Sequence, residues 1–169
     1  MQKYQASSMR KYQYLATLCS FVMLSFCLSC NSNTVYKSHQ EIKDGLWYAK
    51  DKPEFTVNIE DTTARYNVYY LLRTAIQYPY YNLYLTRKIT DPDQQVLAYD
   101  LVELKVSDEI TGKPYGKGLG DLFDQKIPFL KNYEFKRRGS YTFEIGQSMR
   151  QDPLPFVMSI GISVEKVEP

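Results

Sequence analysis

The chain has 169 residues, 44% of them hydrophobic and 24% charged, and a formal net charge of +2. Three of its 21 lysines and arginines and none of its 19 acidic residues precede Cys30, so the part from Cys30 onward carries a formal net charge of −1, and we expect no nucleic-acid partner. All three cysteines lie at or before residue 30, which leaves the rest of the chain without a thiol for a disulfide, a zinc site or a nucleophile.

The first residues have the pattern of a secretory signal. Three basic residues and no acidic residue accompany an apolar run over residues 14–28, and the small Ser29 precedes Cys30. The run is shorter than the roughly 20 apolar residues that a transmembrane helix needs. We therefore predict a lipoprotein signal peptide at residues 1–29, with cleavage before Cys30 and a lipid carrying palmitate on the new amino-terminal cysteine.

Two features of this leader leave an alternative open. Leu28 lies one place nearer the cleavage site than in the usual lipoprotein pattern, and Cys27 stands where an aliphatic residue is expected. The alternative is an ordinary signal peptide cut elsewhere, or an uncleaved anchor. Residues 30–46 are expected to form a tether and entry segment, which begins with a polar run at 31–34 and contains the single histidine, His39, as a solvated linker residue.

From Trp47 onward, hydrophobic residues recur with a period of two, which is typical of strands with one buried face. Turn signals separate these runs, among them Asp91-Pro92-Asp93 and Gly112-Lys113-Pro114. No long amphipathic helical pattern is present, although residues 41–47 could form a short helix ending near Gly45. The alternating runs lie at residues 55–59, 66–72, 83–85, 102–106, 141–145 and 156–164.

Many short strands with frequent turns predict an all-β fold. We expect an antiparallel β-sandwich, jelly-roll-like, as a single domain over residues 47–169. A closed barrel is the alternative. A chain of this size can bury about two-thirds of its unfolded surface, so the domain needs no disulfide or metal to fold.

No catalytic residue is assigned, because the chain beyond residue 30 holds one histidine and no cysteine to form a base–nucleophile pair. Two carboxylates across a cleft could hydrolyse a glycosidic bond, but the spacing selects no pair among Asp100, Glu103, Asp121, Asp124 and Glu144. Calcium could bind several acids, but turn formation is the simpler interpretation of Asp91, Asp93, Asp121 and Asp124. We expect neither an enzyme nor a bound metal or cofactor.

The segment from Gly116 to Asp121 has three alternating glycines, which resembles a phosphate-binding loop at first sight. Such a loop connects a strand to a helix of useful length, and no helical pattern follows Asp121. Alternating glycines in a strand-rich chain more simply indicate a tight bend or bulge where two backbones approach each other.

The composition is rich in tyrosine. Three of the 16 tyrosines precede Cys30 and 13 follow it. A cluster of tyrosines could bind sugars through the faces of their rings. In a regular strand Tyr80 and Tyr84 lie on the face opposite Tyr81, so only part of this cluster could form one platform. An envelope carbohydrate-binding module is therefore the alternative function, with speculative binding residues Tyr78, Tyr80, Tyr81 and Tyr84.

Taken together, these motifs resemble the gliding-motility lipoprotein GldH family of Bacteroidetes. The resemblance rests on the leader with Cys30 and on segments starting at Trp47, at residues 55–61 and 66–73, and above all at 78–85, 116–121 and 139–150. It implies a lipid-tethered cell-envelope protein without a catalytic residue, whose partners are envelope proteins of the motility and secretion apparatus. We expect an outer-membrane protein, and because the run after Cys30 lacks acidic residues, we expect it to face the periplasm.

Overall fold

The computed structural model describes residues 33–168 of the chain. The predicted signal peptide and the predicted lipidation site, Cys30, lie outside the described residues. Within residues 33–168 no helix is long and apolar enough to cross a membrane.

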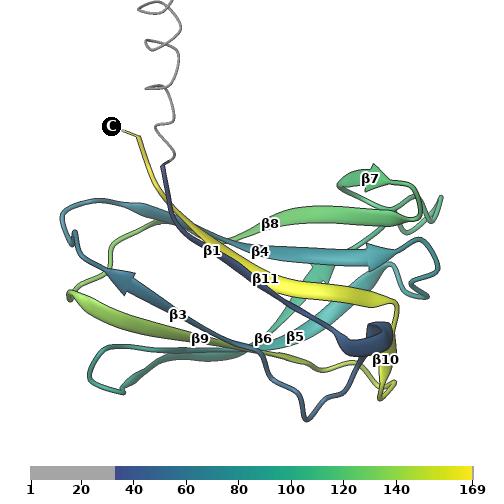
Figure 1. Ribbon diagram of the computed structural model, residues 1–169, viewed down its shortest axis with the longest axis horizontal. Coiled ribbons are helices and arrows are strands. Elements are labelled where there is room, and N and C mark those ends of the chain that lie inside the picture. Colours follow the sequence, from purple (N-terminus) through teal and green to yellow (C-terminus); the bar gives the residue numbers. More distant parts are fainter. Residues whose placement is uncertain (1–32, 169) are drawn as a thin grey trace, which may run out of the picture. The chain divides into compact units, whose positions relative to one another are not determined.

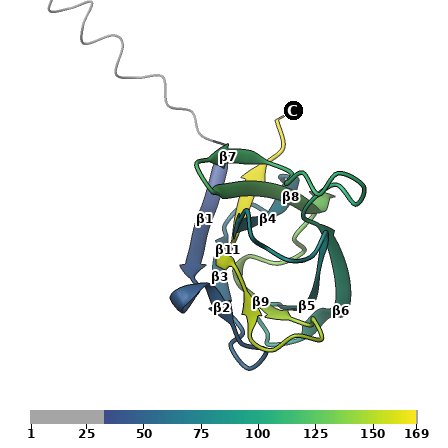
Figure 2. The same cartoon turned by 90° about the vertical axis from the view of Figure 1, so that its right-hand side faces the viewer.

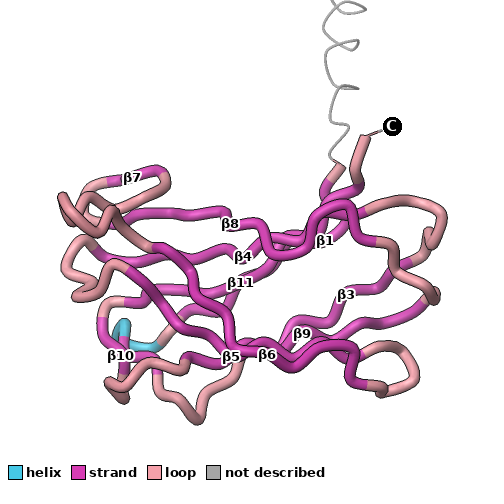
Figure 3. The backbone as a smooth tube through the Cα atoms, turned by 180° about the vertical axis from the view of Figure 1, so that it is seen from behind, coloured by secondary structure: helices cyan, strands magenta, loops and turns pink. Residues whose placement is uncertain are grey.

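Two antiparallel sheets pack face to face in the described domain (Figures 1 and 2). The first sheet has the order β1 (Thr34–Glu41), β11 (Val157–Lys166), β4 (Tyr66–Ala75), β8 (Leu122–Tyr133) and β7 (Lys117–Leu119). The second has the order β3 (Glu54–Ile59), β9 (Gly139–Gln147), β5 (Asn82–Thr90) and β6 (Val96–Lys105). At one end lie the short pair β2 (Leu46–Trp47) and β10 (Leu154–Pro155) and the 3-10 turn η2 (Lys43–Gly45), drawn in cyan in Figure 3.

The strand connections are those of a jelly roll. In the first sheet β1 pairs with β11 and β4 with β8, while in the second β3 pairs with β9 and β5 with β6. This nesting of early strands with late ones is the double Greek key of jelly rolls. The predicted all-β sandwich is confirmed, and each sheet ends in free edge strands instead of closing into the alternative barrel.

The period-two pattern places one face of each strand in the core. In β3 the side chains of Phe55, Val57 and Ile59 are buried and their neighbours are exposed. Phe55 lies opposite Phe143 of β9, so the predicted runs meet across the sheet. Each fully buried side chain of this kind contributes about 1.5–3 kcal/mol to folding.

Aromatic rings fill one end of the core. Phe135 is the centre of this group, with ring centroids 5.3 Å from Tyr66 and 4.7 Å from Tyr141. The two tyrosine hydroxyls donate to backbone carbonyl oxygens, of Asp61 at 2.6 Å and of Arg137 at 3.0 Å. Much of the tyrosine content is therefore structural, because the ring is buried while its hydroxyl keeps a hydrogen bond.

Strand β1 begins inside the segment that we expected to be a tether. Residues 34–41 pair with β11 along its length, as when Ser38 lies opposite Ile162, so the sandwich starts well before Trp47. The prediction failed because β1 is an edge strand held mainly by backbone pairing, and its mostly polar, exposed side chains show no alternation. His39 is exposed on this strand, with Nε2 3.2 Å from Glu41 Oε1. The expected short helix is reduced to the single turn η2.

The last predicted row of hydrophobic residues is wrong at its start. Ile160, Ile162 and Val164 are buried as expected, but Phe156 is exposed and Val157 is buried in its place. A register shift between Val157 and Ser159 against β4 moves the alternation by one residue. A bulge of this kind exchanges the two faces of a strand, which a strict period of two cannot anticipate.

The glycine-rich segment forms the tight β7–β8 hairpin, as predicted. Leu119 lies opposite Leu122, so Gly120 and Asp121 are the turn, with a φ of 61° at Gly120. At Gly116, where φ is 91°, a β-carbon would lie 2.2 Å from the carbonyl oxygen of Asp124. These glycines serve close backbone approach and a left-handed turn.

Candidate functional site

The four tyrosines of the predicted cluster do not lie on one strand, because β5 begins only at Asn82. Tyr78 and Tyr80 precede it in a loop, with ring centroids 6.0 Å apart and ring planes at 73°. The Tyr78 hydroxyl donates to the carbonyl oxygen of Asn82 at 2.9 Å, and the Tyr80 hydroxyl donates to Gln151 Oε1 at 2.8 Å. Both hydroxyls are thus used within the fold, and burial raises the pKa of Tyr78 above its ordinary value.

The other two tyrosines are exposed. Lys105 Nζ lies 4.5 Å from the centroid of the Tyr81 ring, which is a cation–π contact. Tyr84 lies on the outer face of β5, opposite Glu103 of β6. The structure therefore brings the partly buried Tyr78 and Tyr80 together edge to face and leaves Tyr81 and Tyr84 exposed, without a coplanar platform of four rings.

A small polar network joins β5 to β6 next to Tyr81 and Tyr84. The buried Asn82 donates to Glu103 Oε1 at 2.6 Å, and Lys105 donates to the same oxygen at 2.9 Å. These two hydrogen bonds favour the ionised carboxylate and lower the pKa of Glu103. Glu103 is therefore an ionised carboxylate with two hydrogen-bond donors on the sheet surface, which does not suit it to act as a proton donor.

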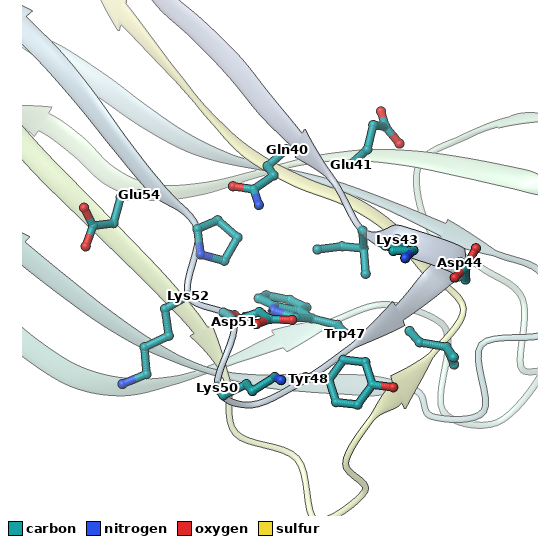
Figure 4. A pocket seen from close by; sticks show the side chains of 13 residues that line it. Gln40, Glu41, Lys43, Asp44, Trp47, Tyr48, Lys50, Asp51, Lys52 and Glu54 are labelled. Carbon is teal, nitrogen blue, oxygen red and sulfur yellow. Dashed lines mark hydrogen bonds between the residues drawn. The ribbon is translucent and has the colours of Figure 1, made fainter.

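A hollow of about 750 Å³ lies along the segment between β1 and β3 (Figure 4). Its floor includes the fully buried Trp47, whose Nε1 donates to the carbonyl oxygen of Asp51 at 2.8 Å. Tyr48 and Lys50 lie at its rim, with Lys50 Nζ 5.4 Å from the Tyr48 ring centroid. The sequence gives no signal of this hollow, because its residues come from a short irregular segment without periodicity.

A second hollow, of about 500 Å³, lies against the outer face of the first sheet and is lined by charged side chains. Arg73 of β4 donates two hydrogen bonds to Asp124 of β8, at 2.6 and 2.9 Å. The Arg73 hydrogen bond is the main cause of a lowered pKa at Asp124. Lys126 beside it donates to both oxygens of Glu165, at 2.6 and 2.8 Å. These charged side chains are thus paired with one another by hydrogen bonds.

Several of the acids considered in the sequence for hydrolysis or calcium binding have structural partners of their own. Asp100 accepts two hydrogen bonds from Arg87, and Asp124 accepts two from Arg73. Asp91 accepts the backbone N–H groups of Asp93 and of the residue two further on, so it forms the predicted turn. Among residues 33–168, no three of the histidine, cysteine and acidic side chains lie close enough to hold a metal ion.

Arg87 is a buried feature that sequence reasoning did not find. Its strand position places the guanidinium on the inner face of β5, and the side chain is 13% exposed. The guanidinium carbon lies 5.4 Å from the centroid of the Phe129 ring. Burial raises the pKa of the neighbouring Tyr70 to about 12, and the positive charge of Arg87 opposes that rise. An arginine within an alternating run is usually interpreted as a surface residue, so the sequence pattern did not indicate that the Arg87 side chain is buried.

The fold and these surfaces define a class: a jelly-roll domain whose described surface carries ion pairs and exposed aromatic side chains. The chain belongs to the GldH lipoprotein family, whose family model matches residues 34–164. The match begins at the first residue of β1, so the family's shared body includes the strand that we had assigned to the tether. The family resemblance expected from the sequence is confirmed.

Two curated relatives support this assignment. The chain is 27% identical over 145 residues to a "gliding motility lipoprotein GldH homolog" of Christiangramia forsetii, covering 82% of this chain and 87% of the relative. It is 24% identical over 145 residues to the "gliding motility lipoprotein GldH" of Flavobacterium johnsoniae, covering 82% and 88%.

Solved structures match more weakly. An arabinose-bound α-L-arabinofuranosidase matches with a TM-score of 0.36 and 12% identity, over 77% of this chain and 19% of the enzyme chain. The VP2 subviral particle protein of infectious bursal disease virus matches with a TM-score of 0.37 and 13% identity, over 80% and 31%. Neither is similar enough to indicate a function for this chain.

Proposed function

We propose that this protein is a lipid-anchored component of the bacterial cell envelope that serves gliding motility and its secretion machinery without catalysing a reaction. The observation that carries the proposal is the family match over residues 34–164, with two relatives named as gliding motility lipoproteins or homologues. The leader supports it independently, because it ends at a cysteine that can carry lipid. The protein is anchored in the outer membrane, faces the periplasm and serves as a structural or assembly factor.

The start of the sandwich sharpens this proposal. The carbonyl oxygen of Asn33 accepts a hydrogen bond from the Lys166 N–H at 2.8 Å, and the Asn33 side chain bonds Glu168. In the sequence Asn33 follows the proposed lipid-bearing Cys30 by three residues, so only a short stretch of chain links the lipid to the sandwich.

Fractionation of cells tests the anchor. In cells that produce the full chain, Cys30→Ala is expected to move the protein from the membrane to the soluble fraction and to abolish labelling by palmitate. Cys27→Ala is the matched control and is expected to leave both unchanged. A Cys30→Ala protein that stays labelled and membrane-bound would overturn the lipidation site.

The motility role needs a separate measurement. In a gliding host, deletion of the gene is expected to stop colony spreading and to reduce secreted surface proteins, and the full chain restores both. Normal spreading and secretion in the deletion strain would contradict the role, whatever the anchor experiment shows.

An envelope carbohydrate-binding module is the second candidate, supported by the exposed rings of Tyr81 and Tyr84. Binding on a glycan array that disappears in the Tyr81→Ala/Tyr84→Ala variant would favour it. An array without any signal from the folded protein removes it.

A further inference from the structure

The hollow of about 500 Å³ on the outer face of the first sheet contains a polar group that the fold does not use. Ser159 of β11 lines this hollow and is only 5% exposed. Among residues 33–168, no group forms a hydrogen bond with its hydroxyl. A buried hydroxyl without a partner costs free energy, so this position indicates a partner that the described residues do not supply.

The Ser159 hydroxyl is open toward the hollow. Within the described part of the chain, the Tyr70 hydroxyl is the one side-chain oxygen or nitrogen that is both completely covered and without a hydrogen bond. The Ser159 oxygen is therefore still accessible, at a residue that lines the hollow. Ser163, four residues further along β11, shows the usual arrangement, because its hydroxyl donates to Glu165 Oε1 at 3.0 Å.

The lining of this hollow is basic. With His39 neutral its formal charge is +3, from four cationic side chains and one carboxylate: Lys37, Arg73, Lys117, Lys126 and Asp124. Two further carboxylates lie just outside the lining, where Glu165 pairs with Lys126 and Glu41 lies 3.2 Å from His39. When they are included, a surplus of one positive charge remains.

Two of the four cations have no carboxylate partner. Asp124 accepts two hydrogen bonds from Arg73, and the Lys126 ammonium group donates to Glu165. Over residues 33–168, no carboxylate forms an ion pair with Lys37 or Lys117. A bound anion could therefore attract these two lysines without breaking an existing pair.

Strand pairing arranges these groups around Ser159. Arg73 of β4 lies opposite Ser159 on one side and opposite Asp124 on the other, and Asp124 lies opposite Lys117 of β7. The Arg73 hydrogen bond is the largest cause of the lowered pKa of Asp124, and the charge of Lys37 on β1 adds to it. Lys37 thus faces the same hollow from the opposite edge of the sheet, and the two lysines flank the serine.

We propose that this hollow binds a phosphate ester, with the Ser159 hydroxyl donating to a phosphate oxygen and with Lys37 and Lys117 supplying positive charge from the two sides. A phosphomonoester suits these groups because it carries nearly two negative charges at pH 7 and has three strong acceptor oxygens. The volume of about 500 Å³ leaves room for the rest of a small molecule. This inference stands apart from the lipid anchor and from the motility role.

Calorimetric titration of the purified full chain in detergent with glucose 6-phosphate, at an ionic strength of about 0.15 M, tests the proposal. We expect saturable binding that Lys37→Gln/Lys117→Gln weakens about tenfold and Ser159→Ala about threefold. The matched control Lys113→Gln/Lys131→Gln removes the same charge from two exposed lysines outside the hollow, and it should bind like the wild type. Thermal unfolding of each variant shows that it is folded.

Short-chain lipids distinguish the two sources of such a phosphate. Dihexanoyl phosphatidic acid carries a phosphomonoester, whereas dihexanoyl phosphatidylcholine carries none. Binding of the phosphatidic acid about tenfold tighter than that of glucose 6-phosphate identifies a lipid headgroup, and equal or weaker binding identifies a soluble phosphate ester. The proposal is overturned if neither phosphomonoester binds, or if the choline lipid binds as tightly as the phosphatidic acid. It is also overturned if Lys37→Gln/Lys117→Gln or Ser159→Ala binds like the wild type, or if the control loses binding equally.

Discussion

Arg87 and Asp100 lie directly opposite each other on β5 and β6 and are joined by two hydrogen bonds, Nε to Oδ1 at 2.9 Å and Nη2 to Oδ2 at 2.5 Å. The Arg87 side chain is 13% exposed and the Asp100 side chain 45%. The pair thus connects the interior of the sandwich to its edge strand. A bidentate pair of this geometry fixes the relative position of two strands as well as stabilising them.

Removing Asp100 should leave the arginine charge largely buried and without its partner. We expect Asp100→Ala to lower the free energy of unfolding by about 2 kcal/mol, less than for a fully buried pair, because Asp100 itself is partly solvated. Urea denaturation measures this. The double variant Arg87→Met/Asp100→Ala should regain part of the loss, since no unpaired charge remains. The exposed pair of Lys105 and Glu103 is the control, and Lys105→Met should cost less than about 1 kcal/mol.

Trp47 should be the most costly truncation in the segment between β1 and β3. Its side chain is fully buried and its Nε1 donates to Asp51, so Trp47→Ala should destabilise the protein by about 3–5 kcal/mol. The adjacent Tyr48 is exposed at the rim of the hollow, and Tyr48→Ala should change stability by about 0.5 kcal/mol or less. Equal losses in thermal or urea unfolding would show that Trp47 does not fill the core as described.

Strand β1 should depend on the absence of a side chain at Gly161. A β-carbon there would lie 2.2 Å from the Ser38 carbonyl oxygen, so Gly161→Ala should displace β1 and cost about 1–3 kcal/mol. Hydrogen exchange should show faster exchange in residues 34–41. Gly112→Ala is the control, because it meets no atom within 4 Å and carries only backbone strain from a φ of 68°. Unchanged exchange in β1 of Gly161→Ala would contradict the pairing.

Tyr70 should contribute to the alkaline limit of stability. Burial raises its pKa to about 12 from 10.0. A group whose pKa is raised by folding stabilises the native state below its unfolded pKa, and this contribution is lost as the pH rises from about 10 to about 12. Tyr70→Phe should therefore lose less stability between pH 9 and pH 11.5 than the wild type. Among the described residues no hydrogen-bond partner is found for its hydroxyl, so the substitution should change stability at pH 7 by less than about 1 kcal/mol. Identical alkaline profiles for the two proteins would refute this role.

Local sequence pattern predicted the strands whose inner faces are apolar throughout. Phe55 to Ile59 and Tyr141 to Ile145 alternate strictly and are buried as expected, because one face of each packs against the opposite sheet. The pattern failed where pairing alone makes the strand, as in the polar β1, and where a bulge shifts the faces, as at Val157. Neither feature leaves a periodic signal in the residues concerned.

At the candidate site, too, the local sequence predicted one arrangement of the tyrosine cluster and the tertiary structure has another. Tyr78 to Tyr84 are neighbours in sequence, and a regular strand would have alternated them between two faces. Instead β5 starts at Asn82, and hydrogen bonds to Asn82 and Gln151 fix Tyr78 and Tyr80 in the loop before it. Side chains distant in sequence, such as Gln151, decide these positions, and they are not visible in the local pattern.

The sequence by itself determined the family and the all-β class, because these depend on residue order and on the two-residue repeat of a pleated strand. Only the tertiary structure decided that Arg87 lies inside the sandwich, that β1 belongs to it, and that Ser159 lines a hollow with basic side chains. The reason is that burial in a sandwich depends on which strands become neighbours. That choice is made between segments far apart in the chain, after each has already satisfied its own local pattern.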